Sequence, residues 1–442
     1  SGYWGDRFDA VDDLVAKGNV NYLAFDYLAE LTMSILQKQK NKDPKKGYAT
    51  DFLEVLKRIL PECRKKNIRM VASAGGVNPE SLGAEILSLA KSQGIKVKVA
   101  MILGDNIFSS IDQLISQGCT FENMETGEPF SAVKNRIANA NVYLGAEPIV
   151  QALQGCADIV ITGRNTDTSL FLGPMIHEFG WKWNDLDRLA SGIAIGHIIE
   201  CGGQVTGGNY TGGWKDVPDL ENLGWPIAEV SENGEAIITK PEGTGGLVSS
   251  GTVKEELLYE IGDPTSYITP DVVADFSRIF VEDAGHNKVK VWGSTGRKAP
   301  ETLKVSMGYS DGYKISCEIS YAWPDALQKA KLADKILRSR MDKIGLKPLE
   351  IRSEYIGYNS IMGPISEREA GDPEEVRLRI SLRTKTTKEA DMLALEVPCM
   401  VTAGPPHGSG YNLGRSRPVE VLAYWPCLVP ARFIKPEVRF ME

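Results

Sequence analysis

His197 and Glu200 lie three residues apart at the end of an apolar segment with helical character, and a glycine-rich loop follows at once. Because residues i and i+3 share one face of a helix, the imidazole and the carboxylate are expected to point the same way. Such a pair suits proton transfer. A buried His–Glu hydrogen bond before a helix end is an equally open interpretation. In the first interpretation the loop adds ligand-binding groups at Gly202, Gly203 and Asn209, since glycine lets backbone amides approach a ligand closely.

A second candidate is the segment Gly163–Thr168, which offers one cation, one anion and two hydroxyls within five residues. Arg164 is predicted to bind a substrate carboxylate, Asp167 to donate or accept a proton, and Thr166 and Thr168 to contact the substrate. The alternative is an ordinary helix N-terminus that Asp167 caps. We favour the functional interpretation because a cap has no need of the arginine.

The third candidate is a glycine turn between a strand and a helix, with Gly75, Gly76 and Asn78 as predicted substrate-binding residues. Free amides at a helix N-terminus bind anions. Plain helix capping, with Asn78 as the N-cap and Pro79 in the first turn, is the alternative. Asp105 follows the next strand and is a further candidate for substrate binding.

A bound metal is a secondary expectation. Cys201 points about 100° away from Glu200 on a helix, so no zinc site is predicted, because zinc needs three or four ligands together. Asp6, Glu30 and Asp105 are the alternative oxygen ligands of a divalent ion. Coenzyme A is expected only as part of a substrate, and no other cofactor is required.

The composition and the absence of common motifs narrow the range of functions that the sequence is compatible with. The 442 residues are 42% hydrophobic and 24% charged, with a net charge of −8, which is ordinary for a soluble protein and argues against nucleic-acid binding. No apolar run approaches the ~20 residues of a membrane span. Seven cysteines without a Cys-x-x-Cys pair predict a reducing compartment, the cytoplasm. The chain has no Walker A pattern, His-Glu-x-x-His or serine nucleophile elbow.

The first half of the chain alternates strands and helices. Strands are predicted at 22–25, 68–73, 96–103 and 158–162, with helices between them. This order predicts an α/β fold with a parallel sheet and helices on both faces. Ligands in such sheets bind beyond the carboxyl ends of the strands. The candidate polar residues follow these ends, so they are expected to gather at one edge of the sheet.

The second half predicts a smaller α+β domain with an antiparallel sheet. Strands at 303–309 and 313–321 flank Ser310-Asp311-Gly312, which is a hairpin signal. A boundary within 213–226 gives two domains, residues 1–220 with the proposed site and residues 221–442. The opening Ser1–Asp6 is glycine-rich, and we expect a first strand upstream of it.

Five stretches carry a resemblance to a known family: Ser1–Arg7, Asp26–Thr32, Ala74–Pro79, Gly163–Thr168 and His197–Asn209. In them, and over most of its length, the chain resembles the acyclic terpene utilisation family. That family is named for the breakdown of citronellol- and geraniol-type compounds through acyl-CoA intermediates. The resemblance implies a cytoplasmic enzyme of acyl-CoA or branched carboxylic acid metabolism, and it supplies no mechanism.

The leading hypothesis is a hydratase- or dehydratase-type lyase that acts on a small molecule, a CoA-linked or free branched acid. His197 and Glu200 form its acid–base pair, Asp167 is a second proton-transfer group, and Arg164 clamps an anion. Amides of Gly75, Gly76, Gly202 and Gly203 would stabilise an enolate-like oxygen. The alternatives are a divalent-metal-dependent lyase or hydrolase and a non-catalytic acyl-CoA-binding partner subunit. Self-association into a homo-oligomer is expected, with neither a nucleic-acid nor a membrane partner.

Overall fold

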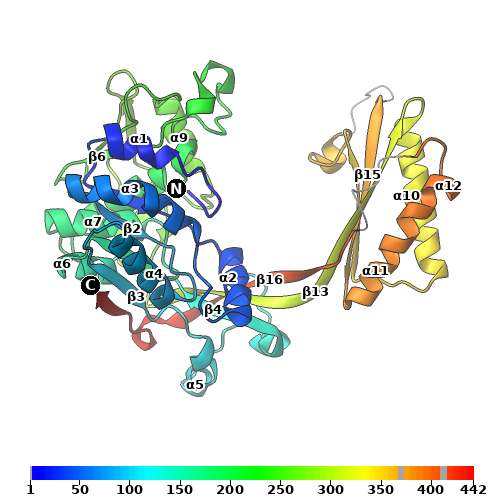
Figure 1. Ribbon diagram of the computed structural model, residues 1–442, viewed down its shortest axis with the longest axis horizontal. Coiled ribbons are helices and arrows are strands. Elements are labelled where there is room, and N and C mark those ends of the chain that lie inside the picture. Colours follow the sequence, from blue (N-terminus) through cyan, green and yellow to red (C-terminus); the bar gives the residue numbers. More distant parts are fainter. Residues whose placement is uncertain (1, 367–372, 409–415) are drawn as a thin grey trace. The chain divides into compact units, whose positions relative to one another are not determined.

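The computed structural model describes residues 2–366, 373–408 and 416–442. Contacts divide the chain into two compact units (Figure 1). Unit 1 comprises Ser1–Gly308 and Tyr424–Glu442, and unit 2 comprises Tyr309–Ala423. The contacts divide the chain at residues 308 and 423 and not at residue 220. The two domains 1–220 and 221–442 stay a prediction.

A mostly parallel sheet is the centre of unit 1. Its strand order is β1 (Tyr22–Phe25), β2 (Arg69–Ala72), β5 (Ile159–Thr162), β3 (Val99–Leu103) and β17 (Glu437–Met441). The first four strands pair in parallel, and β17 pairs antiparallel with β3. The four parallel strands lie where the hydrophobic runs predict them, and the α/β fold class is confirmed.

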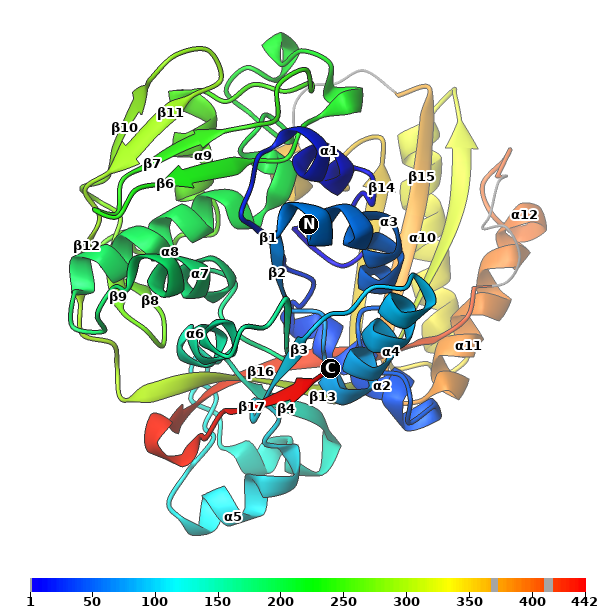
Figure 2. The ribbon, with the colours of Figure 1, turned by 60° about the vertical axis from the view of Figure 1, so that its left-hand side comes forward.

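Helices cover both faces of this sheet (Figure 2). On one face lie α1 (Ala10–Lys17), α3 (Asp51–Lys66) and α4 (Pro79–Ser92), whose apolar residues share a core with alternate residues of the strands. On the other lie α6 (Glu147–Gln154) and α7 (Ser169–Phe179), and α8 (Leu186–Glu200) packs on α7. Parallel strands buried on both faces are apolar at nearly every position, as β5 is.

Helix α8 is apolar around most of its circumference because it is enclosed by other elements. It packs on α7 and α9 (Ser250–Leu258), and on two antiparallel sheets formed by residues after 220. The first sheet has the order β10 (Phe280–Asp283), β11 (Val289–Trp292), β7 (Ala236–Thr239) and β6 (Ile227–Val230), and the second β12 (Thr295–Arg297), β9 (Val273–Asp275) and β8 (Tyr267–Ile268). This shared core explains why residues 221–308 belong to unit 1.

Three further elements complete unit 1, namely α2 (Glu30–Lys42), α5 (Ile111–Ser116) and β4 (Ile137–Val142). Strand β4 pairs with β13 (Thr302–Ala322), a strand whose first residues belong to unit 1 and whose later residues belong to unit 2. Helix α2 packs against β4. This packing brings Glu30 and Ser34 of the helix toward the carboxyl ends of the parallel strands.

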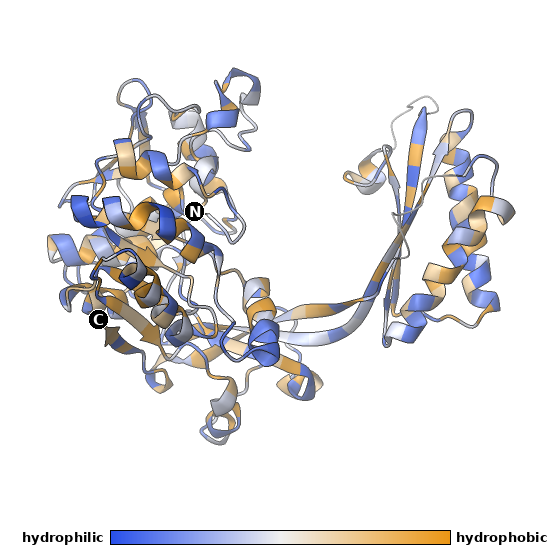
Figure 3. Ribbon diagram, viewed as in Figure 1, coloured by the Kyte–Doolittle hydropathy of each residue, from blue (hydrophilic) through white to orange (hydrophobic). Residues whose placement is uncertain are grey.

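Unit 2 is an antiparallel sheet with helices on one face, as the α+β prediction requires. Its order is β14 (Glu350–Ile356), β15 (Glu375–Thr384), β13 and β16 (Val419–Pro430), and its helices are α10 (Ala326–Lys343), α11 (Thr387–Glu396) and α12 (Met400–Ala403). Helices α10 and α11 both alternate hydrophobic and hydrophilic residues (Figure 3), and their apolar residues pack on β13 and β15.

The predicted hairpin at Ser310–Gly312 is wrong. Strand β13 runs unbroken through these residues. Gly312 has a φ of +83°, and a Cβ there would lie 2.3 Å from the Thr384 carbonyl oxygen. Arg383 of β15 donates a 2.9 Å hydrogen bond to Asp311. The aspartate and the glycine therefore allow β13 to pair closely with β15. The same Asp-Gly sequence is also typical of a hairpin turn, so the sequence alone does not distinguish the two structures.

Candidate active site

The Arg164 guanidinium lies at the centre of a charged cluster beyond β5, and its side chain is only 3% exposed. Nη1 donates to Asp167 Oδ1 at 2.6 Å and to the Asn165 carbonyl oxygen at 2.9 Å. Nη2 lies 3.9 Å from Glu30 Oε1, and the guanidinium carbon lies 4.3 Å from the centre of the Tyr143 ring. The cation is thus balanced by carboxylates of the protein itself. The structure gives no support to the predicted substrate-carboxylate clamp.

The ends of β1 and β2 join this cluster through Asp26 and Ser73. The Ser73 hydroxyl donates to Asp26 Oδ1 at 2.7 Å and accepts a hydrogen bond from the Tyr27 amide at 2.9 Å. Burial and the nearby Asp167 charge raise the pKa of Asp26 well above its usual range, although Arg164 acts in the opposite direction. The polar ends of three strands therefore meet, as the parallel topology predicts.

The His197–Glu200 pair forms as predicted, with Nδ1 2.9 Å from Oε1. The His197 ring is 2% exposed and lies against Tyr267 and Phe276, at centroid distances of 5.4 and 5.6 Å. Burial raises the pKa of Glu200 well above its usual value, and the charge of Asp167 raises it further. Burial lowers the pKa of His197. Both shifts favour the uncharged form, which is the neutral imidazole for His197 and the protonated carboxyl group for Glu200.

Two buried atoms of this pair have no hydrogen-bond partner among the described residues, namely Nε2 of His197 and Oε2 of Glu200. Aromatic rings enclose the imidazole, so it is placed to orient Glu200 and not to meet a substrate. Glu200 also lines a slot in unit 1. The structure thus forms the buried His197–Glu200 hydrogen bond, and the role of the pair in proton transfer stays a prediction.

A row of buried polar side chains leads from α2 to the backbone of Arg164. Ser34 donates to Asn139 (2.6 Å), Asn139 to Asn141 (3.2 Å) and Asn141 to Asp105 Oδ2 (2.8 Å). The same Asp105 oxygen accepts the Arg164 amide at 2.9 Å. Burial raises the pKa of Asp105 to about 6. Asp105 therefore holds the Arg164 loop in place, and its contacts assign it no ligand-binding role.

The predicted glycine cradle is already occupied by the protein's own contacts. The Gly75 amide donates to the Thr162 carbonyl oxygen at 2.9 Å, and a Cβ at residue 75 would approach that oxygen to 2.7 Å. Gly76 has a φ of +56°, and a Cβ there would lie 2.5 Å from the Gly47 carbonyl oxygen. These glycines permit close backbone packing, which gives a physical reason for their presence without a ligand.

Asn78 and Thr166 also bind backbone. Asn78 occupies the N-cap position of α4, yet its side chain makes no cap hydrogen bond. The side-chain amide instead donates to the carbonyl oxygens of Pro44 and Lys46 at 2.9 and 2.8 Å. The prediction that the Asn78 side chain caps the helix is therefore wrong. The amide and hydroxyl of Thr166 both donate to the Leu144 carbonyl oxygen.

The other predicted ligand-binding residues lie at the starts and ends of helices. Thr168 is fully buried at the N-cap of α7, and its hydroxyl has no partner among the described residues. Gly202 turns the chain after α8 with a φ of +61° and lines the slot beside Glu200. Gly203 accepts the Gly208 amide through its carbonyl oxygen, and Asn209 is exposed in a left-handed turn.

The alternative metal ligands are engaged in other contacts. Asp6 accepts the amides of Gly2 and Arg7, both at 2.8 Å, and Glu30 accepts the Tyr143 hydroxyl. Among residues 2–366, 373–408 and 416–442, no group of three or more His, Cys, Asp or Glu side chains is arranged to hold a metal ion. The structure therefore gives Asp6, Glu30 and Asp105 separate roles.

Sequence reasoning missed several members of the cluster. Tyr143, Ser34, Asn139 and Asn141 were not predicted, and Asp26 was not among the candidate site residues. One signal was available: asparagine alternates with alanine in the buried strand β4, and asparagines on one face of a buried strand need partners.

The fold and the cluster define an α/β protein with a buried cluster of charged side chains at the carboxyl ends of its parallel strands. The chain belongs to the family described as acyclic terpene utilisation family protein AtuA, whose model matches residues 1–440. No curated protein and no solved structure matches it. In the described part of the chain, we find no helix with the length and apolar character that crossing a membrane requires.

Proposed function

We propose that this protein is a proton-transfer enzyme, a hydratase- or dehydratase-type lyase, that acts on branched acyl thioesters such as acyl-CoAs. One observation carries the proposal: the buried Arg164 holds the Asp167 carboxylate by a 2.6 Å contact, and Glu200 lies near enough for the Asp167 charge to act on it. Burial and the Asp167 charge raise the pKa of Glu200, so these two carboxyl groups have different proton affinities. Neighbouring groups whose pKa values are driven apart are the usual mark of paired acid and base.

In the dehydration direction, Asp167 is the base and Glu200 is the acid. The Asp167 side chain is 35% exposed while it contacts Arg164, so a substrate can reach an ion-paired carboxylate. Asp167 takes the proton α to the thioester carbonyl, the bond from the β-carbon to the hydroxyl breaks, and the Glu200 proton completes the leaving water. Hydration is the reverse. His197 acts as a positioning residue because its hydrogen bond orients Glu200.

The charge of the site favours a thioester over a free acid. Carboxyl groups of Asp26, Glu30, Asp167 and Glu200 lie around Arg164, whose Nη1 atom is already bonded to protein acceptors. A substrate carboxylate would meet like charges at short range. A neutral thioester carbonyl would not. Coenzyme A enters as part of the substrate, and the step needs no other cofactor. We place the enzyme in the cytoplasm as a homo-oligomer, in keeping with seven free cysteines.

The test is turnover of branched enoyl- and 3-hydroxyacyl-CoA thioesters, measured by absorbance of the conjugated thioester. Glu200→Gln and Asp167→Asn are expected to lower kcat by about 100-fold or more, and Glu200→Gln is expected to do so with little change in melting temperature. Asp112→Asn is the matched control, since that side chain is 83% exposed. Retained turnover in both variants would contradict the proposal. Turnover that requires an added divalent ion would favour the metal-dependent alternative instead.

A further inference from the structure

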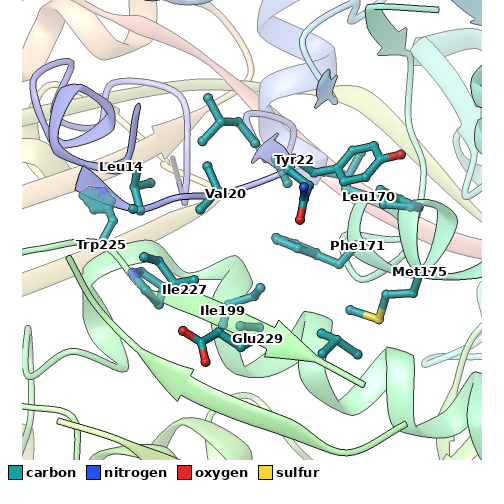
Figure 4. Close-up of a pocket in the computed structure, with 18 of the residues that line it drawn as sticks. Leu14, Val20, Tyr22, Leu170, Phe171, Met175, Ile199, Trp225, Ile227 and Glu229 are labelled. Carbon is teal, nitrogen blue, oxygen red and sulfur yellow. The ribbon is translucent and has the colours of Figure 1, made fainter. Parts of the chain in front are cut away.

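A slot of about 450 Å³ lies in unit 1 between two strands of different sheets (Figure 4). One wall is the stretch 18–25, which contains β1, and the facing wall is the stretch 225–230, which contains β6. Every residue of both stretches lines the slot. Successive residues of a strand point to opposite faces, so the slot follows the backbone edges of β1 and β6 and not a side-chain face.

Both edges are unpaired in the described part of the chain. β1 lies at the end of its sheet and pairs with β2, and β6 lies at the end of its sheet and pairs with β7. A strand at a sheet edge presents a row of N–H and C=O groups that need partners. A plain hydrocarbon chain in the slot would leave these groups unpaired, which costs free energy. The slot therefore favours a ligand that carries hydrogen-bonding groups along its length.

The helices that line the slot contribute mostly apolar side chains. Helix α1 contributes Val11 and Leu14, and α7 contributes Phe171, Pro174 and Met175. Ligand sites commonly combine such apolar surface with a few backbone N–H and C=O groups that fix the ligand's orientation. The two kinds of wall together suit a narrow, extended chain that is partly apolar and contains amide groups.

The two ends of the slot differ in chemistry. At the carboxyl end of β1 lies Glu200, which lines the slot and whose charge contributes to the raised pKa of Asp26, the residue after β1. At the amino end, the slot meets a polar cavity of about 320 Å³. Three residues line both, namely Asn21, Tyr22 and Glu178.

The polar cavity contains one arginine without a carboxylate partner. Arg69 Nη1 donates to His177 Nε2 at 2.9 Å and to the Tyr22 hydroxyl at 3.3 Å. No carboxylate of the residues that the structure describes lies within ion-pairing distance of Arg69. The other arginine of the cavity, Arg64, is ion-paired with Asp158. Arg69 is therefore the cation that can bind an anionic group at this end of the slot.

We propose that the slot binds the pantetheine arm of an acyl-CoA substrate, an inference that rests on the proposed function. The arm is an extended chain with peptide-like amides, and it is about as long as four residues of a strand, roughly 13 Å. β1 has four residues. The amides of the arm pair with the edges of β1 and β6, and its methyl groups meet the apolar walls. The thioester then lies beside Glu200, and the phosphate groups lie at Arg69.

The test uses an S-alkyl-CoA thioether, which carries the arm and has no thioester to react. Its binding should slow amide hydrogen exchange in 22–25 and 227–230 about ten-fold. ADP, which has the phosphates without the arm, is the matched ligand control and should leave these amides unchanged. Arg69→Gln is expected to raise the Kd of the thioether about ten-fold, since it removes a charge-assisted hydrogen bond. Arg58→Gln should not, because Arg58 is ion-paired with Asp12 and lines neither cavity.

These measurements separate the slot from the proposed reaction, because none of them needs turnover. Glu200→Gln should keep the protection of both strand edges while it loses turnover. Turnover of an acyl-CoA without protection of either edge would overturn the slot assignment and leave the proposed function standing. Protection without turnover of any branched acyl-CoA would support the slot and count against the proposed function.

Three further results would overturn the proposal. ADP would protect the two edges as strongly as the thioether does. An apolar tetrapeptide would protect them at lower concentration than the thioether, which indicates a peptide-binding slot. In the third, the native protein and Arg69→Gln would bind the thioether with equal Kd.

Discussion

The most quantitative prediction concerns how Asp105 makes the stability of the fold depend on pH. Its side chain is buried, and burial changes its proton affinity. The side chain is 3% exposed, and burial raises its pKa from 3.8 to about 6. The folded state therefore binds this proton more tightly than the unfolded state, so the contribution of Asp105 to stability is fully present below pH 4 and is lost as the pH rises toward 7. A shift of about 2 units corresponds to about 3 kcal/mol.

Asp105→Asn removes this titration while an amide oxygen can still accept the Arg164 and Asn141 hydrogen bonds. The free energy of unfolding of the variant minus that of the native protein is expected to be about 3 kcal/mol larger above pH 7 than at pH 4. Denaturant unfolding followed by tryptophan fluorescence measures this, since seven of the eight tryptophans belong to unit 1. A difference that stays constant from pH 4 to pH 8 would refute the reasoning. Asp271→Asn offers a second case, because burial also raises the pKa of Asp271 to about 6.

Three further predictions concern the cluster and its support. Arg164→Met should destabilise unit 1 by about 3–5 kcal/mol, since it leaves buried carboxylates without their cation; equal stability in denaturant would disprove this. Gly308→Ala should cost about 1–3 kcal/mol, because its Cβ would lie 1.9 Å from Ser34 Oγ. Adding Ser34→Ala should recover part of that loss, and strict additivity in the double variant would rule out the contact. Glu256→Gln should shift the alkaline limb of the turnover profile to lower pH, because the Glu256 charge raises the pKa of Glu200; an unmoved limb would count against Glu200 as the acid.

The parallel strands and their shared polar edge were predictable because each is encoded locally. Four apolar runs alternate with helices, and parallel pairing alone brings their carboxyl ends together. The same rule predicts that Arg164 and Asp26, which follow two strands of this sheet, lie near one another. The i, i+3 spacing was enough to predict the His197–Glu200 contact.

Other features depend on partners that lie far away in the sequence. The Tyr143 hydroxyl binds Glu30, which lies 113 residues away in the sequence, and Glu30 also lies beside Arg164. Because Glu30 supplies a negative charge there, Arg164 is not a free cation for a substrate anion. The glycines at 75 and 76 were interpreted as a ligand cradle, although they serve close backbone packing. Strand β17 joins the sheet from the end of the chain, and no local pattern specifies which strand it pairs with.

The claim on which the mechanism depends is that Glu200 holds a proton at neutral pH, beside ionised carboxylates. Infrared spectroscopy tests it directly, because a protonated carboxyl group has a C=O stretching band that a carboxylate lacks. At pH 7 we predict such a band in the native protein and a weaker band in Glu200→Gln, because Asp26, whose pKa is also raised, keeps its own contribution, with Asp112→Asn unchanged. An identical carboxylic acid spectrum in native protein and Glu200→Gln would contradict the account.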